Sequence, residues 1–194
     1  MMHSTIGSTG ASSTSTGTCT TSSVASEGKS TVAANLAIAF AELDIRVLLV
    51  EADLRRPRLS TYLGIERSVG LSSVLAGQVQ LDDVLQPWGD HLSVLPSGPT
   101  PPNVASMLGS ARMTELVGSW RSRFDVVIVD SPPLLPVTDA ALISTMTDGV
   151  IIVARHGLVT RKQLTNSVRG LEAVGAHIFG FVFNMIPRRQ AKDY

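Results

Sequence analysis

Four consecutive residues near the start of the chain, Gly28-Lys29-Ser30-Thr31, have the types and the order that phosphate and metal binding require. They precede an apolar run with helical spacing, so they lie where a loop would enter a helix. Backbone N–H groups at a helix N-terminus carry partial positive charge and can surround an anion. The Lys29 ammonium would reach the phosphates of a nucleotide, and the Ser30 hydroxyl would hold Mg²⁺. The four residues therefore predict a phosphate-binding loop.

Acidic residues elsewhere in the chain decide how much weight this motif carries. A strict form of the motif has a second glycine five residues before Gly28, where this chain has Ser23, so the motif alone is weak. Glu51, Asp53 and Asp130 each come at or just after the end of an apolar, strand-like run. Ligands of open α/β sheets bind outside the carboxyl ends of the strands. One lysine, one hydroxyl and three acids at that edge predict a site for Mg²⁺ and a nucleoside triphosphate.

Helix-like and strand-like runs alternate along the chain, and this alternation indicates the fold class. The 44% hydrophobic content with only 16% charged residues fits a sheet that is buried on both faces. We therefore predict an α/β fold of the P-loop NTPase type, with a doubly wound, mainly parallel sheet and helices on both faces. The expected helices lie at 29–43, 70–77, 81–85, 111–123, 136–145 and 160–174, and the expected strands at 46–50, 92–96, 126–129, 150–154 and 177–183.

Several side chains have expected structural roles within these elements. Trp120 is expected in the core, Thr160 as a helix cap, and Asp139 as a helix-start residue that the helix dipole favours rather than as a metal ligand. The expected core face of the first helix consists of Val32, Leu36, Ala39, Phe40 and Leu43.

The chain divides into one domain and two polar ends. Residues 1–21 are rich in Ser, Thr and Gly, and are expected to be disordered. The domain is expected over 22–187, followed by a polar tail over 188–194. A phosphate loop normally follows a buried, Val/Ile-rich strand, which the sequence before Ser22 does not supply. Two explanations stay open: an unusually polar first strand, or a native N-terminal sequence that has been lost or replaced.

Composition limits the cell compartment and the partners. The formal net charge is zero, so overall charge gives no reason to expect nucleic acid as a partner. Cys19 is the single cysteine, which excludes an intramolecular disulfide. The longest apolar runs have the length of a strand, and the N-terminus lacks the pattern of a secretory signal. A cytoplasmic setting is therefore expected.

The motifs together resemble the cytoplasmic catalytic domain of the bacterial tyrosine autokinases, the BY-kinases, over about residues 21–194. These enzymes work with polysaccharide co-polymerases in capsule and exopolysaccharide export. The segments that carry the resemblance are E-G-K-S-T-V-A-A-N-L-A, V-L-L-V-E-A-D-L-R-R-P, L-P-S-G-P-T-P-P-N, F-D-V-V-I-V-D-S-P-P-L-L-P-V-T-D-A and G-F-V-F-N.

The resemblance implies an ATP-dependent protein-tyrosine kinase that uses ATP and Mg²⁺. Lys29 and Asp53 would be the catalytic pair, with Asp53 activating a tyrosine hydroxyl. Tyr194, the tyrosine of the tail, would be the phosphate acceptor. The residues implied to bind nucleotide are Ser26, Glu27, Gly28, Lys29, Ser30, Thr31 and Asn184, of which Thr31 would contact the α-phosphate and Asn184 the adenine. The residues implied to bind the metal are Ser30, Glu51, Asp53 and Asp130.

The resemblance also implies a partner and leaves two rival functions open. The partner would be a membrane polysaccharide co-polymerase of the Wzz-like type, which would hold the chain at the inner face of the plasma membrane; a homo-oligomer is compatible with the family. The family usually has Pro-Gly at Ala25-Ser26 and Asp at Glu51, which favours a weak or inactive regulatory relative as the first rival. The second rival is a Min/Par-type ATPase, whose additional lysine would stand at Val24.

Overall fold

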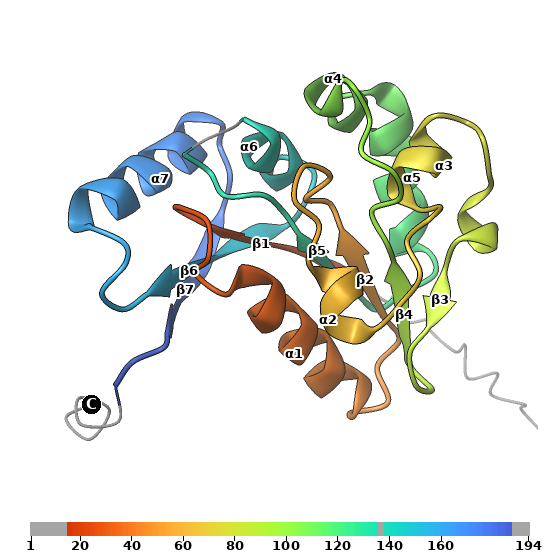
Figure 1. Ribbon diagram of the computed structural model, residues 1–194, viewed down its shortest axis with the longest axis horizontal. Helices are drawn as coiled ribbons and strands as arrows, with labels where there is room; N and C mark the ends of the chain where they lie inside the picture. Colours follow the sequence, from red (N-terminus) through yellow and green to blue (C-terminus); the bar gives the residue numbers. More distant parts are fainter. Residues whose placement is uncertain (1–14, 136–137, 188–194) are drawn as a thin grey trace, which may run out of the picture.

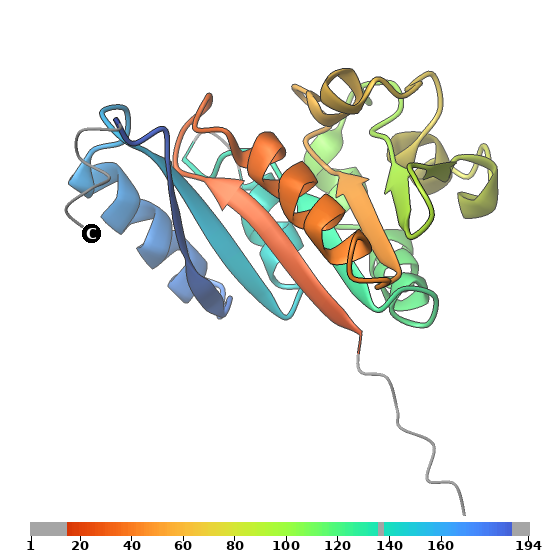
Figure 2. The same ribbon diagram turned by 90° about the horizontal axis from the view of Figure 1, so that it is seen from below.

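The computed structural model describes residues 15–135 and 138–187 of the protein, and these form one seven-stranded sheet with helices on both faces (Figures 1 and 2). The strand order is β3-β4-β2-β5-β1-β6-β7, and every pairing is parallel except that of β3 with β4. This confirms the predicted doubly wound α/β fold. The strands are β1 Thr16–Ser22, β2 Val47–Glu51, β3 Gln86–Pro87, β4 Leu92–Leu95, β5 Val126–Asp130, β6 Gly149–Arg155 and β7 Ile178–Asn184.

The predicted helices occur in the expected order with shorter bounds at several ends, and two further short helices, Leu59–Leu63 and Val104–Leu108, were not predicted. Thr160 caps the last helix as expected, because its hydroxyl accepts a hydrogen bond from the Gln163 N–H. The predicted helix at 81–85 is a single 3₁₀ turn at Leu81–Asp83. The α-helices are α1 Lys29–Ala41, α2 Leu59–Leu63, α3 Leu71–Leu75, α4 Val104–Leu108, α5 Ala111–Arg121, α6 Asp139–Ser144 and α7 Arg161–Ala173.

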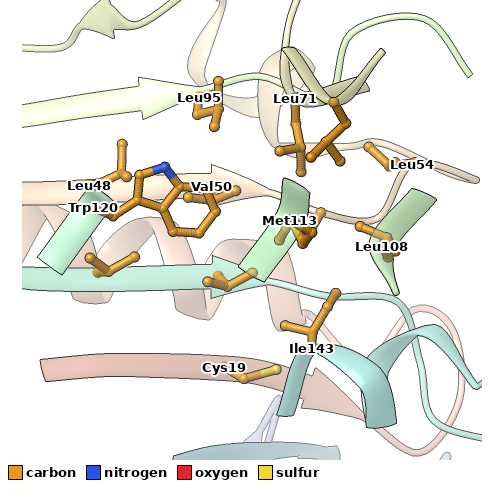
Figure 3. Close-up of a cluster of buried hydrophobic side chains, with 14 of the residues drawn as sticks. Cys19, Leu48, Val50, Leu54, Leu71, Leu95, Leu108, Met113, Trp120 and Ile143 are labelled. Atoms are coloured by element: carbon orange, nitrogen blue, oxygen red, sulfur yellow. The ribbon is translucent and has the colours of Figure 1, made fainter. Parts of the chain in front are cut away.

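Two apolar layers hold the helices on the sheet, one on each face. The larger layer joins β1, β2, β5 and β6 to the helices α3 to α7, and Figure 3 shows Trp120 and Met113 of α5 packed over Leu48 and Val50 of β2. Trp120 is fully buried, as predicted. The smaller layer joins α1 and α2 to the other face of β2, β4 and β5. Burial on both faces is the reason why β2 and β5 read as continuous apolar runs.

The predicted core face of α1 is only partly correct, since Leu36 and Phe40 pack against the core but are not fully buried. The buried positions of this helix are Lys29, Ala33, Ala34 and Ala37, whereas Leu43 lies beyond its end and is 68% exposed. Alanine side chains let the helix lie close to the sheet, where bulkier residues would hold it away. The larger residues of α1 are partly buried at the edges of this contact instead.

The central strand β1 corrects the predicted N-terminal boundary. Residues 16–21, which were expected to belong to a disordered tail, lie in β1 between β5 and β6, and the rest of the predicted tail up to residue 14 lies outside the described residues. Of the two explanations left open, the structure supports an unusually polar first strand. Threonine is β-branched and suits a strand, and the Thr21 hydroxyl donates to the Pro132 carbonyl at 2.9 Å. The tail over 188–194 also lies outside the described residues.

Candidate nucleotide-binding site

The loop between β1 and α1 has the shape of an anion cradle. Gly28 is the N-cap of α1, with a left-handed φ of 88° that favours glycine. A Cβ at this position would lie 2.1 Å from the Asn184 side-chain nitrogen, so a larger residue would also clash. Ser23, which stands where the strict motif has glycine, accepts a hydrogen bond of 2.8 Å from the buried Ser167 hydroxyl of α7. The loop is therefore fixed although it lacks the first glycine.

Ser26 is held in a strained backbone conformation. Its φ is 65°, which lies in the left-handed region. The family usually has glycine at this position of the sequence. A side chain in this region costs about 1–2 kcal/mol. Ser26 also lines the cavity described below, and its carbonyl accepts a hydrogen bond of 3.3 Å from the Arg155 guanidinium.

Glu27 and Asn184 tie the loop to the two strands at one end of the sheet. The buried Glu27 carboxylate accepts hydrogen bonds from the Val24 N–H at 2.8 Å and from the Arg155 N–H of β6 at 3.1 Å. The Asn184 amide of β7 donates to the Glu27 carbonyl at 2.9 Å. The sequence motif placed Glu27 at the nucleotide, but the structure gives its carboxylate a supporting role. Adenine recognition by Asn184 stays a prediction.

Lys29 lies at the centre of the predicted constellation. Its ammonium nitrogen is 3.0 Å from Asp53 Oδ2 and 3.5 Å from Asp130 Oδ1, so the structure joins three of the predicted residues. Burial lowers the pKa of Lys29, but attraction by Asp130 and Asp53 outweighs it and holds the pKa above the ordinary value. The ammonium is also 3.4 Å from the Ser30 hydroxyl. Lys29 is therefore a charged lysine at the loop that would hold phosphate.

Asp130 is a buried carboxylate that lacks a hydrogen-bond partner in the described structure. It is fully buried at the end of β5, and neither of its oxygens accepts a hydrogen bond within the residues described. Burial raises the pKa of Asp130 to about 6, although attraction by Lys29 opposes the shift. A carboxylate of this kind fits a bound cation, which would supply the missing partner. Ser30 and Asp130 are the residues that would hold Mg²⁺, with water and phosphate oxygens completing its shell.

Glu51, which was also predicted as a metal ligand, is engaged elsewhere. Its Oε1 accepts hydrogen bonds from the backbone N–H groups of Leu59 at 2.6 Å and Ser60 at 3.2 Å. Its Oε2 accepts from the Ser60 hydroxyl at 2.5 Å and from the Ser97 N–H at 3.1 Å. Four donors occupy both oxygens of this fully buried carboxylate, so the structure does not support Glu51 as a ligand. The side chain fastens the start of α2 and the loop after β4.

A cavity of about 450 Å³ opens beside Lys29. Ser30 and Thr31 line it from the start of α1, and Asp53 lines it from the loop after β2. This volume falls within the range of small-ligand sites. The full lining is Ala25, Ser26, Gly28, Lys29, Ser30, Thr31, Asp53, Arg55, Arg56, Arg58, Pro132 and Pro133.

Asp139 has a contact that sequence reasoning missed. It lies in the first turn of α6, as predicted, but its fully buried carboxylate also binds the Arg55 guanidinium at 2.6 and 3.3 Å. The pair links the loop after β2 to α6, two segments 84 residues apart. Spacing in the sequence gave no sign of it. Tyr194, the predicted acceptor, lies outside the described residues.

A glycine-lysine-serine turn between a central strand and a helix, with a buried aspartate at the end of the adjacent strand, defines the P-loop class of nucleoside-triphosphate-binding proteins. The chain matches the AAA domain family over residues 25–175. Tyrosine-protein kinase YwqD of Bacillus subtilis (strain 168) is 39% identical over 165 residues, which cover 84% of this chain and 70% of YwqD. The chain therefore belongs to the bacterial tyrosine-protein kinase family.

Other comparisons agree with this assignment. Tyrosine-protein kinase Etk of Escherichia coli (strain K12) is 36% identical over 168 residues, which cover 86% of this chain and 23% of Etk. The solved kinase domain of Escherichia coli Etk matches with a TM-score of 0.87 at 34% identity, covering 92% of this chain and 70% of that domain's chain. The septum site-determining protein MinD from Pyrococcus horikoshii OT3, solved with Mg-ADP, matches with a TM-score of 0.75 at 25% identity, covering 92% of this chain and 76% of MinD.

The chain spans about a quarter of the length of Etk, and the solved structure that it matches is the kinase domain of that protein. Among the residues described, no helix combines the length and the apolar character that a bilayer crossing requires.

Proposed function

We propose that this chain binds Mg-ATP and transfers the γ-phosphoryl group to a tyrosine hydroxyl, as an autokinase that regulates the synthesis and export of capsular or extracellular polysaccharide. The observation that carries the proposal is the buried Asp130 carboxylate, whose oxygens lack a hydrogen-bond partner in the described structure, next to Lys29 at the phosphate loop. Family membership and the Mg-ADP complex of MinD support the choice of ligand.

Each residue of the site has a place in this reaction. The N-terminus of α1 and the Lys29 ammonium would bind the β- and γ-phosphates, and Ser30 and Asp130 would hold Mg²⁺, which neutralises charge as the phosphoryl group moves. Lys29 pairs with Asp53 at 3.0 Å in this structure, so contact of the lysine with phosphate would free Asp53 Oδ2. Asp53 would then accept the proton of the tyrosine hydroxyl as its oxygen bonds to phosphorus, and ADP would leave.

Radiolabelled ATP tests the proposal. The full chain is incubated with γ-labelled ATP and Mg²⁺, and labelled phosphotyrosine is located by mass spectrometry. The chain has two tyrosines, Tyr62 and Tyr194, and we expect the label on Tyr194. Lys29→Ala should abolish the label, whereas Lys162→Ala, at an exposed position of α7, should leave it unchanged.

Two outcomes would contradict the proposal. ATP binding without any phosphotyrosine would show that this chain is a weak or inactive relative of the kinases. The backbone strain at Ser26 favours that alternative. Label that survives Lys29→Ala would show that the site is elsewhere.

We also propose that the chain works at the inner face of the membrane through a polysaccharide co-polymerase. The similarity to Etk supports this partner, because the family that this chain resembles works with polysaccharide co-polymerases. Adding the cytoplasmic segment of a co-polymerase should raise the labelling rate, and a scrambled segment of equal charge should not. Equal rates with both segments would argue against the partner.

A further inference from the structure

Three arginines follow Asp53 and line the same cavity, but they differ in their charge partners. Arg55 is paired with Asp139, which balances its charge. Arg56 and Arg58 are exposed, and neither forms an ion pair with a carboxylate in the described part of the chain. Two uncompensated guanidinium groups therefore border the cavity.

Asp53 connects the segment that carries these arginines to the phosphate loop, and both border the same cavity. One of its oxygens, Oδ2, contacts the Lys29 ammonium, and the other, Oδ1, accepts a hydrogen bond of 3.1 Å from the Arg56 N–H. Asp53 therefore stands between the lysine that would hold phosphate and the segment that carries Arg56 and Arg58. An acceptor tyrosine that approaches Asp53 from that side passes the two arginines.

The other described residues of the cavity wall offer no free counter-charge to these groups. Among them the one carboxylate belongs to Asp53, which is engaged by Lys29, and Pro132 and Pro133 are apolar. Guanidinium groups bind carboxylates through paired hydrogen bonds, which makes arginine suited to recognising acidic segments. In the sequence, the tail tyrosine Tyr194 directly follows Asp193, which Lys192 precedes, whereas Tyr62 has no adjacent acidic residue. A single carboxylate next to the tyrosine is therefore the group that these arginines could recognise in this chain.

We propose that Arg56 and Arg58 bind carboxylates next to the acceptor tyrosine, so that the kinase selects tyrosines in acidic segments. The proposal rests on the proposed kinase function and specifies the substrate class of the same site. It differs from a role in nucleotide binding, in which the same two arginines would contact the phosphates of ATP.

Three peptides that differ only around a central tyrosine test this selection. The tyrosine is flanked by Glu, by Gln or by Lys, and kcat/KM is measured with the full chain and saturating Mg-ATP. We expect the Glu peptide to exceed the Gln peptide by about tenfold, the size that two partly exposed charge pairs predict, and the Lys peptide to be poorest. The preference should fall as salt rises, because salt screens exposed charges.

Variants assign the preference to the two arginines. Arg56→Gln/Arg58→Gln should reduce the Glu-to-Gln ratio to about one, and Arg56→Glu/Arg58→Glu should reverse the order in favour of the Lys peptide. Arg169→Gln is the matched control, an exposed arginine of α7 away from the cavity, and should keep the tenfold ratio. Affinity for a fluorescent ATP analogue should be unchanged in Arg169→Gln, and in Arg56→Gln/Arg58→Gln it should fall by much less than the Glu-to-Gln ratio does.

Binding measurements separate this proposal from the kinase proposal. The same peptides with Phe in place of Tyr are titrated by fluorescence anisotropy, which requires no phosphoryl transfer. Tighter binding of the Glu peptide, lost in Arg56→Gln/Arg58→Gln, would support the acidic site even if no tyrosine were phosphorylated. Equal binding of the Glu and Gln peptides would overturn it even in an active kinase, and so would a loss of nucleotide affinity in the double variant with the peptide preference intact.

Discussion

Asp130 shows at the residue scale that a functional group can weaken the fold that holds it. Burial raises the pKa of Asp130 to about 6 from an ordinary value near 3.8, so the ionised form is less stable in the folded protein than in the unfolded chain. The unfolded chain loses its proton first as pH rises from about 4 to 6, which lowers the free energy of unfolding across that window. Above pH 6 the penalty is complete and constant, at up to about 3 kcal/mol.

We therefore expect Asp130→Asn to stabilise the nucleotide-free protein and to abolish Mg-ATP binding. The gain should be absent below pH 4, grow between pH 4 and 6, and stay constant above pH 6, because an amide carries no charge to bury. Urea unfolding at several pH values measures the stability, and calorimetry measures nucleotide binding. A variant that is destabilised at pH 8 would contradict the assignment of Asp130 as an unfavourably buried charge.

Glu51 makes the opposite prediction, although the family usually has Asp at this position. Glu51→Asp should lower the free energy of unfolding by about 1–3 kcal/mol, because the shorter side chain cannot keep all four hydrogen bonds at Leu59, Ser60 and Ser97. Thermal denaturation measures the change. Glu66→Asp is the control, since this exposed glutamate also accepts two backbone N–H bonds, and it should cost less than about 0.5 kcal/mol.

The sequence was sufficient to locate the site residues that stand in a local pattern. Lys29 and Ser30 stand in a short motif, and Asp130 ends an apolar run, so their positions could be predicted. The role of Glu51 depends on donors up to 46 residues away in the chain, and that of Glu27 on a strand 128 residues away. No local pattern reports such partners, so the sequence predicted a metal role for Glu51 without any sign of the four protein donors that its carboxylate accepts from.

The central strand β1 offers a direct measurement at the scale of one element. Thr20 and Thr21 are adjacent and fully buried, but only Thr21 has a hydrogen-bond partner for its hydroxyl, the Pro132 carbonyl. Thr20→Val should stabilise the protein by about 1–2 kcal/mol, because it removes a buried hydroxyl without a partner. Thr21→Val should destabilise it by a similar amount, because it leaves the carbonyl without its donor.

Chemical denaturation of the two variants measures this contrast, and each variant is the other's control for the loss of a threonine from the strand. Changes of the same sign in both would show that strand propensity, rather than hydrogen bonding, determines the stability of β1.

The first helix shows why hydrophobic periodicity was insufficient for an element. The prediction gave the core face mainly to bulky residues, yet the fully buried residues are Ala33, Ala34 and Ala37, and the larger ones are only partly buried. Periodicity reports which residues are apolar but not the space that the sheet leaves for them. Here that space is small, because a short loop at the end of β1 leads directly into the helix. The distance between helix and sheet depends on the tertiary structure, so the periodicity of the sequence could not predict it.

At the scale of the whole molecule, the phosphate loop is connected to the β7 edge of the sheet. Glu27 accepts the Arg155 N–H of β6, and Asn184 of β7 holds the Glu27 carbonyl. Bound Mg-ATP at 100 times its dissociation constant should stabilise the fold by about 2.7 kcal/mol. We expect part of this effect to appear as slower hydrogen exchange at the carboxyl ends of β6 and β7.

Glu27→Gln should weaken this remote protection while Mg-ATP still protects α1, because a single amide oxygen replaces a carboxylate that holds two backbone donors. Hydrogen exchange followed by mass spectrometry resolves the two regions. Glu42→Gln, at the exposed end of α1, is the control and should leave both protections intact. Equal protection of β6 and β7 in the wild type and Glu27→Gln would argue against the connection.

The polar composition of β1 has a consequence for the chain during its synthesis. The strand pairs with β5 and β6, whose residues follow about 110 and 131 positions later, so β1 leaves the ribosome long before its neighbours exist. An apolar strand waiting for that time would be an aggregation hazard, whereas Thr, Ser and Gly remain compatible with water. Thr18→Val/Thr20→Val should therefore give less soluble protein during translation, even if the purified variant is more stable. The polar composition of β1 would then be explained by the need to keep the unpaired strand soluble during synthesis.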